Sequence, residues 1–304
     1  MVGVRNRRDA ARARRAASSP DNTLRLPCRA ARGAIRSAVA LSAATTPIEL
    51  VTFDCTGTLF EPTRSVGELY KAALVAEAQK LGLDTTFSSL DERALDAGFA
   101  EAYASAAQIR PCFGALTSIA RTSEGWWRPL VQETYVRGGV ARDALAPAFP
   151  GAFDYLYNTA FVTTDGWRLR PHARQALEQL SRRAGGARHV GVISNWDERL
   201  PLLLQRLGIA HTIDFVVASR LEKVEKPSRE IFDRARALAG VSAEARCVHV
   251  GDSFALDVQG AVDAGFEAVW IAPPAKAVAA ARGATPHLYL STLETLPDAL
   301  EWFG

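Results

Sequence analysis

Five short apolar runs rich in β-branched residues recur along this chain, and they constrain its fold more than any other feature. The runs are IELVTF (48–53), HVGVIS (189–194), DFVVAS (214–219), CVHVG (247–251) and EAVWIA (267–272). Their almost unbroken apolar character is typical of strands that are covered on both faces, as in a parallel sheet. Because parallel neighbours need a crossover connection, such strands should alternate with helices.

Stretches with helical periodicity do alternate with the later runs. They cover residues 171–184, 198–208, 228–240 and 255–265. Ser228 is suited to cap the start of the third stretch, and Gly240 follows its last apolar residue. Strands and helices that alternate at these lengths form βαβ units. We therefore expect an α/β fold with a doubly wound, Rossmann-like parallel sheet.

The first two apolar runs are separated by an unusually long interval, since the first ends at residue 53 and the second begins at residue 189. Four helical patterns occupy most of it, at residues 65–82, 90–108, 123–136 and 141–160. We interpret 63–165 as a helical lid inserted after the first strand. The predicted α/β core then consists of residues 47–62 and 166–304.

The N-terminal segment has a composition unlike the rest. Residues 1–46 contain ten Arg, no Lys and two Asp, a charge of +8, whereas the whole chain carries +3. An Arg-rich, acid-poor leader of this kind predicts an organellar transit peptide, for chloroplast or mitochondrion without distinction. The alternative is an unstructured basic tail on a cytoplasmic protein.

Charge and hydropathy also exclude classes of partner. Subtracting the +8 of residues 1–46 from the net charge of +3 leaves a net charge of −5 on the rest of the chain. This remainder lacks the broad positive field that binding to nucleic acid requires. No apolar stretch approaches the roughly 18 residues needed to cross a bilayer. We expect a soluble protein that binds neither nucleic acid nor membrane, while its oligomeric state stays open.

Polar side chains lie at or just past the ends of four of the runs. They are Asp54, Ser194 with Asn195, Lys226 and Asp252. In an open parallel sheet, ligands bind at the carboxyl ends of the strands. Residues far apart in the sequence should therefore lie together at one edge of the sheet.

These residue types indicate a site for phosphate and a metal ion. Asp54, Asp252 and the nearby Asp257 offer the carboxylate oxygens that Mg²⁺ prefers. Ser194 can donate a hydrogen bond to a phosphate oxygen, and Lys226 supplies positive charge. Asp54 could act as a nucleophile, because carboxylates form aspartyl-phosphate intermediates.

The ordered motifs FDCTGTL, VISN, EKPSREIF and HVGDSFALD resemble those of the haloacid dehalogenase superfamily of hydrolases. The resemblance covers about residues 47 to 304, and a helical insertion after the first motif is similar to that family's C1-type cap. It implies an Mg²⁺-dependent phosphatase for a small phosphorylated metabolite.

The resemblance also implies a role for each matching residue. Asp54 would be the nucleophile and a metal ligand. Ser194, Asn195 and Lys226 would bind the phosphoryl group, with Lys226 also catalytic. The remaining metal ligands would be Asp252 and Asp257.

The sequence departs from the family pattern at Thr56. Family phosphatases have Asp at this position, two residues after the nucleophile, where it protonates the leaving group. A threonine hydroxyl does not titrate near neutral pH. Loss of a general acid typically slows a reaction by about 10²- to 10⁴-fold. The Thr56 carbonyl remains available as a metal ligand, so Thr56 stays a candidate catalytic and metal-site residue.

Two alternatives to an active phosphatase follow from Thr56. The chain could be a catalytically weak or inactive phospholigand-binding protein. It could also be a 2-haloacid dehalogenase, since those enzymes lack the second Asp too. Asp252 argues against the dehalogenase, because without a cation its carboxylate would face Asp54 as an uncompensated like charge.

Several inserted residues could contact a substrate. Trp126 and Trp127 could stack on it, although aromatic residues on an amphipathic helix usually pack in a core. Arg64, Lys71 and Arg121 could reach an anionic group, but charges on helices mostly contact water.

Overall fold

The computed structural model describes residues 46–83, 85–117, 122–182, 189–273 and 286–302. The predicted transit peptide, apart from Thr46, lies outside the described residues. Among the residues that the structure describes, no helix has the length and apolar character needed to span a bilayer.

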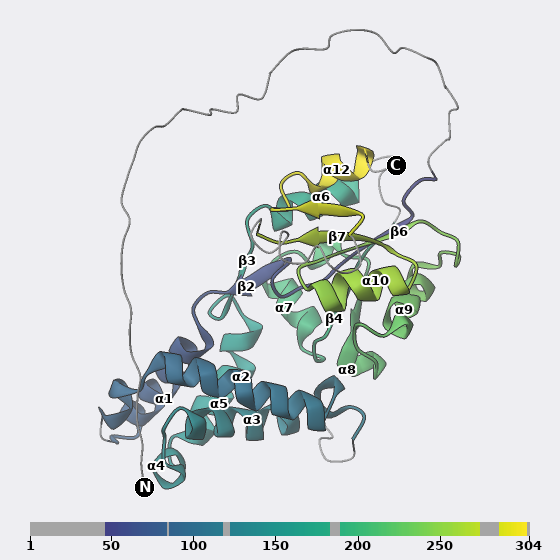
Figure 1. Cartoon of the computed structure of the whole chain (residues 1–304). Coiled ribbons are helices and arrows are strands. Elements are labelled where there is room, and N and C mark those ends of the chain that lie inside the picture. Colours follow the sequence, from purple (N-terminus) through teal and green to yellow (C-terminus); the bar gives the residue numbers. More distant parts are fainter. Residues whose placement is uncertain (1–45, 84, 118–121, 183–188, 274–285, 303–304) are drawn as a thin grey trace, which may run out of the picture. The chain divides into compact units, whose positions relative to one another are not determined.

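A six-stranded parallel sheet forms the centre of the fold (Figure 1). Its strands, in spatial order, are β5 (Phe215–Ala218), β4 (His189–Ser194), β1 (Leu50–Phe53), β6 (Cys247–Gly251), β7 (Glu267–Ile271) and β8 (Leu288–Leu290). All neighbouring pairs are parallel. The α/β prediction is thus confirmed, with β8 as an additional edge strand. Because β1 lies between β4 and β6, the strand order reverses at β1, where a crevice opens beyond the strand ends.

Both faces of the sheet are covered by helices. On one face, Val51 and Phe53 pack with residues of the helices α6 (Ala173–Arg182), α7 (Leu200–Arg206) and α12 (Leu296–Trp302). On the other, Leu50 packs with residues of α9 (Arg229–Ala239) and α10 (Gly260–Asp263). Alternate residues of a strand point to opposite faces, so the mainly apolar β1 contributes side chains to both layers.

The predicted helix ends are largely observed. The Ser228 side chain accepts a hydrogen bond from the Glu230 amide, and Gly240 ends α9 in a left-handed conformation with φ of 66°. Residues 255–265 differ from the expected single helix. They form a π-helical segment, η5 (Phe254–Gln259), followed by α10. Such wide turns frequently occur at functional sites.

In the described part of the chain, five α-helices lie between two short strands, β2 (Phe60–Pro62) and β3 (Trp167–Leu169), which pair antiparallel. The helices, called the inserted helices below, are α1 (Val66–Lys80), α2 (Glu92–Ile109), α3 (Ser123–Arg137), α4 (Arg142–Leu145) and α5 (Phe149–Asn158). The stretch predicted as one helix over 141–160 is divided into α4 and α5. Pro147 follows α4 and has no amide proton with which to continue the hydrogen bonds of the helix.

The inserted helices have an apolar core of their own. α1 packs against α2 and α5, and α2 packs against α3 (Figure 1). Tyr70 of α1 and Tyr135 of α3 are fully buried there, and the Tyr135 hydroxyl donates to the Tyr70 carbonyl at 2.8 Å. A hydrogen-bonded hydroxyl lets an aromatic ring be buried at little cost.

Candidate active site

Asp54 lies directly beyond the central strand β1. Its amide donates to the Val250 carbonyl at 2.9 Å, which continues the sheet pairing up to this residue. The chain then turns at Gly57, which has φ of 85°. A Cβ atom at Gly57 would lie 2.5 Å from Asp252 Oδ2, so only glycine allows the turn to approach this carboxylate. The local sequence thereby brings Asp54 and Asp252 to the same edge.

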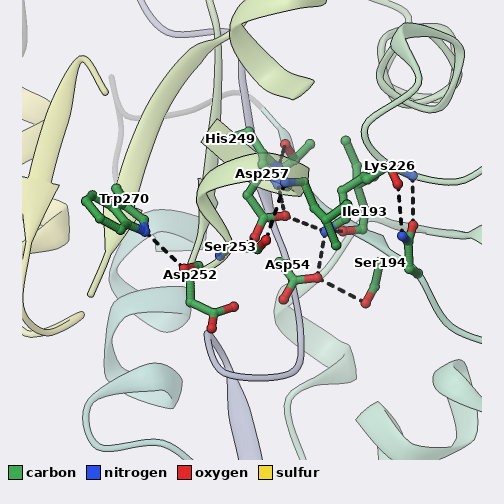
Figure 2. Close-up of polar contacts among 12 residues, drawn as sticks. Asp54, Ile193, Ser194, Lys226, His249, Asp252, Ser253, Asp257 and Trp270 are labelled. Atoms are coloured by element: carbon green, nitrogen blue, oxygen red, sulfur yellow. Dashed lines mark hydrogen bonds and ion pairs between the residues drawn. The ribbon is translucent and has the colours of Figure 1, made fainter. Parts of the chain in front are cut away.

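Lys226 connects two carboxylates inside this edge (Figure 2). Its Nζ donates to Asp54 Oδ1 at 2.6 Å, to Asp257 Oδ1 at 2.6 Å and to the Ile193 carbonyl at 2.9 Å. All three ammonium protons are used. Burial alone would lower the pKa of Lys226, but the charges of Asp257 and Asp54 outweigh burial and raise it. The ammonium is therefore a fixed positive charge.

The two carboxylates bound to Lys226 have opposite pKa shifts. Burial raises the pKa of Asp54. The charge of Lys226 offsets this increase only in part, and the charge of Asp257 raises the pKa further. For Asp257, burial is outweighed by Lys226 and by a hydrogen bond from His249, and its pKa is lowered. Asp257 is thus held ionised, whereas ionisation of Asp54 would benefit from more positive charge nearby.

His249 was missed as a site residue by the sequence analysis. It is buried within β6, with Nε2 at 3.2 Å from Asp257 Oδ1 and Nδ1 at 2.9 Å from the Thr52 hydroxyl. Burial lowers the pKa of His249, which favours the neutral ring. The signal in the sequence was its place in a strand that should be apolar, because a buried imidazole needs polar partners.

Ser194 ends β4 and Asn195 follows it, and both contact the same group of residues. The Ser194 hydroxyl donates to Asp54 Oδ1 at 3.2 Å. Asn195 forms two bonds with the Lys226 backbone, accepting from its amide at 2.8 Å and donating to its carbonyl at 3.1 Å. Asn195 therefore holds the Lys226 loop in place, whereas Ser194 lies beside the carboxylate.

Asp54, Asp252 and Asp257 each place one carboxylate oxygen within 4.8 Å of the others. The Trp270 indole donates to the Asp252 carbonyl at 3.0 Å, and the Ser253 amide donates to Asp257 Oδ2 at 2.8 Å (Figure 2). Three acidic groups face one ammonium here. This excess of negative charge, made of hard oxygen donors, fits a divalent cation such as Mg²⁺.

A cavity of about 720 Å³ opens onto this edge. Its polar end is formed by Asp54, Ser194, Lys226 and Asp252, and the exposed Thr56 also lines it. The remaining wall consists mainly of aromatic and aliphatic side chains, many of them from the inserted helices. The inserted helices thus contribute directly to the site.

A buried ionic contact joins the inserted helices to the core. Asp197, which is 1 % exposed, accepts from Trp127 Nε1 at 2.7 Å. Arg199 binds the same carboxylate through two nitrogens at 2.9 and 2.7 Å, and it donates to the Tyr157 carbonyl at 2.7 Å. The sequence analysis missed this contact. Its signal was the run of charged residues in WDERL, directly after β4.

The other candidate contacts from the insertion are placed as follows. Lys71 forms an ion pair with Glu92 at 3.1 Å, and Arg64 is exposed. Arg121 lies outside the described residues. Trp126 and Trp127 both line the cavity, although Trp126 is almost fully buried.

Residues 48–265 match the family model described as haloacid dehalogenase-like hydrolase. The chain therefore belongs to the haloacid dehalogenase-like hydrolases, which confirms the resemblance.

Among individual proteins, the chain is 32% identical to haloacid dehalogenase-like hydrolase domain-containing protein 3 from Bos taurus, over 84% of this chain and 94% of that protein. The stretches VISNWDERL and HVGDSFALDVQGA resemble this group of proteins.

Solved structures with the same fold include two bacterial proteins. A 2-haloacid dehalogenase from Pseudomonas syringae aligns with a TM-score of 0.56 at 24% identity, covering 84% of this chain and all of that one. A putative HAD-hydrolase from Bacillus subtilis, solved with bound magnesium, aligns with a TM-score of 0.56 at 16% identity. The alignment covers 84% of this chain and 99% of that one.

Proposed function

We propose that this hydrolase is an Mg²⁺-dependent phosphatase that acts on a small phosphorylated metabolite through an aspartyl-phosphate on Asp54. The observation that supports this most directly is the arrangement at the end of β1. There one nucleophile-competent carboxylate lies beside a buried ammonium, a serine hydroxyl and a second carboxylate. Phosphoryl transfer depends mainly on such positioning and charge stabilisation.

In the proposed reaction an Asp54 oxygen attacks phosphorus. A bond forms between this oxygen and phosphorus, and the bond between phosphorus and the alcohol oxygen breaks. Ser194 would donate to a phosphoryl oxygen, and the positive charge of Lys226 would stabilise the negative charge that these oxygens carry in the transition state. Water then attacks the phosphorus of the acyl phosphate, which releases inorganic phosphate and regenerates the Asp54 carboxylate.

Asp54, Asp252 and the Thr56 carbonyl would hold the magnesium ion. Asp257 stays a candidate ligand, because its oxygens retain lone pairs after binding Lys226 and Ser253. When bound, the ion would neutralise charge on the phosphoryl group and favour the ionised form of Asp54. The structure of the putative hydrolase from Bacillus subtilis, which has the same fold, contains magnesium.

Thr56 limits the rate in this proposal. The departing alkoxide needs a proton, and the side chain at position 56 cannot provide one. We therefore expect slow turnover, or turnover restricted to esters with good leaving groups. The same residue favours a second candidate function, a catalytically weak or inactive phospholigand-binding protein. A 2-haloacid dehalogenase is less compatible, because Asp252 lies close to Asp54.

The remaining domain and location assignments are also proposals. Residues 63–165 would act as a lid that excludes bulk water while the ester is bound. The segment 1–46 would direct the protein to an organelle.

A trapping experiment tests the enzyme. Purified protein is incubated with Mg²⁺ and an aryl phosphate, quenched in acid and digested, and the peptide that contains Asp54 is weighed by mass spectrometry. We expect a fraction of this peptide to carry one phosphoryl group, and inorganic phosphate to be released.

Asp54→Asn is the matched control and should give neither signal. If the wild-type protein gives neither product nor a modified peptide, the enzyme is excluded and the binding function remains.

A further inference from the structure

Helices α2 and α3, with the turn between them, supply an aromatic wall to the cavity. This insertion wall consists of Phe99, Tyr103, Phe113, Trp126 and Trp127. The rings support one another, with centroids 4.8 Å apart for Trp126 and Trp127, 5.0 Å for Phe113 and Trp126, and 5.8 Å for Phe99 and Tyr103. Trp127, Phe99 and Tyr103 remain partly exposed. Mutual packing gives the wall a fixed shape, as flat ligands require.

A second aromatic group, which we call the base wall, lies where the insertion meets the core. It consists of Phe161, Trp167 and Trp196, which also line the cavity. The Trp167 and Trp196 centroids are 5.2 Å apart, and those of Phe161 and Trp167 are 6.1 Å apart. An apolar group attached to the phosphate could therefore contact aromatic surface contributed by both parts of the structure.

The polar atoms of several of these rings are already used within the protein. Three indole N–H groups donate hydrogen bonds. Trp126 donates to the Arg110 carbonyl at 2.8 Å, Trp127 donates to Asp197 at 2.7 Å, and Trp167 donates to the Phe161 carbonyl at 3.1 Å. These rings therefore offer apolar faces, and not hydrogen bonds, to a ligand.

Charges around the cavity oppose a second anionic group. Among the described lining residues, the cations are Arg199 and Lys226, and both already bind carboxylates. Glu225 also lines the cavity and accepts from the Cys112 amide at 3.1 Å. Burial, with the charges of Glu225 and Asp197, raises the pKa of Tyr103 to about 12. Along the part of the cavity lining that the structure describes, a carboxylate or second phosphate would meet negative charge and no uncommitted cation to pair it.

We infer that the substrate is a phosphate monoester of an uncharged, apolar alcohol that carries an aromatic or similarly flat group, and that it has no second anionic group. This inference rests on the proposed function, which assigns the phosphate to the Asp54 edge. The cavity volume of about 720 Å³ is within the roughly 300–1,000 Å³ typical of sites for small organic molecules.

A pair of esters with nearly equal leaving groups tests the charge part of the inference. One is 4-ethylphenyl phosphate, and the other is the analogue in which a carboxylate ends the alkyl group. We expect kcat/KM to be at least about tenfold higher for the uncharged ester, because the carboxylate would be desolvated without a partner. Equal values, or a preference for the carboxylate, would overturn the inference.

Two variants test the aromatic part. Phe99→Leu should raise KM for 4-ethylphenyl phosphate by about two- to tenfold, the range expected for loss of one aromatic contact, and leave KM for acetyl phosphate unchanged. Tyr155→Leu is the control, since Tyr155 lies on α5, is also partly buried and is absent from the cavity lining. Thermal unfolding verifies that both variants fold. Equal effects of the two variants would contradict the inference.

Binding separates this inference from the proposed function. Benzylphosphonate, methylphosphonate and a carboxylate-bearing benzylphosphonate are titrated in the presence of Mg²⁺ by calorimetry. Tightest binding of benzylphosphonate without turnover of any ester would support the ligand class and refute the phosphatase. Turnover of the esters, with equal binding of the three phosphonates, would support the phosphatase and refute the ligand class. If the protein neither bound these compounds nor hydrolysed any ester, both the inference and the proposed function would be refuted.

Discussion

Lys226 Nζ lies 2.6 Å from Asp54 Oδ1, although 172 positions separate the two residues in the sequence. The same ammonium lies 2.6 Å from Asp257 Oδ1, and all three side chains are buried. Each charge in this group is stable in the interior only because the others are present. The site is therefore an interdependent cluster, and changing one member should alter both stability and chemistry.

Replacing Lys226 with Met should destabilise the fold. The variant leaves the Asp54 and Asp257 carboxylates without their buried cation, so we expect the free energy of unfolding to fall by about 3–5 kcal/mol. Urea denaturation measures this change. Lys71→Met is the control, because the Lys71–Glu92 pair is partly exposed and should contribute at most about 1 kcal/mol. Similar losses in both variants would show that the buried cluster has no special role in stability.

Introducing an acid at position 56 should accelerate turnover. Thr56→Asp places a titrating carboxyl two residues after Asp54, and we expect kcat for an alkyl phosphate to rise at least about tenfold. Because Thr56 is exposed, folding should be unaffected. Thr56→Asn has a similar shape without the proton and should not increase the rate. An unchanged rate in Thr56→Asp would mean that another group already supplies the proton.

Magnesium should stabilise the folded chain through the three carboxylates. A ligand that binds only the native state adds about 2.7 kcal/mol of stability at a concentration 100 times its Kd. Chemical denaturation with and without Mg²⁺ should show this increase in the wild-type protein and a much smaller one in Asp252→Asn. Asp263→Asn, which alters an exposed carboxylate outside the cluster, should respond like the wild type. An equal response of Asp252→Asn would place the ion elsewhere.

The contact between Trp127 and Asp197 should be stronger than an ordinary indole hydrogen bond. Trp127→Phe removes a donor from a buried carboxylate, and we expect a loss of about 1.5–3 kcal/mol in the free energy of unfolding. Trp167→Phe removes a bond to a neutral carbonyl, for which about 0.5–1.5 kcal/mol is typical. Urea denaturation of both variants compares them. A larger loss in Trp167→Phe would contradict the assigned charge effect.

The strands were predictable where they are buried on both faces. The runs that became β1, β4, β5, β6 and β7 are mainly apolar, because each contributes to two packed layers. The short strands β2, β3 and β8 were not predicted. Each has three residues, too few for a pattern to be detected, and they exist because a neighbouring strand pairs with them.

The convergence of the polar groups was also predictable in outline. The carboxyl ends of parallel strands share one edge, and Asp54, Ser194 and Asp252 do lie there. The roles of Asn195 and His249 could not be predicted. Asn195 binds the backbone of Lys226, and His249 binds Asp257, and these partners depend on how loops and side chains pack.

The sheet, the inserted helices and the edge where the charged groups meet follow from local patterns of residues, because burial and chain connectivity act through such patterns. Which charges pair, and which side chains line the cavity, depends on the folded arrangement of distant segments. Lys226 bridges two carboxylates, Trp127 reaches Asp197, and aromatic rings from distant segments form one cavity. Those outcomes depend on distances and desolvation in three dimensions, which no local pattern encodes.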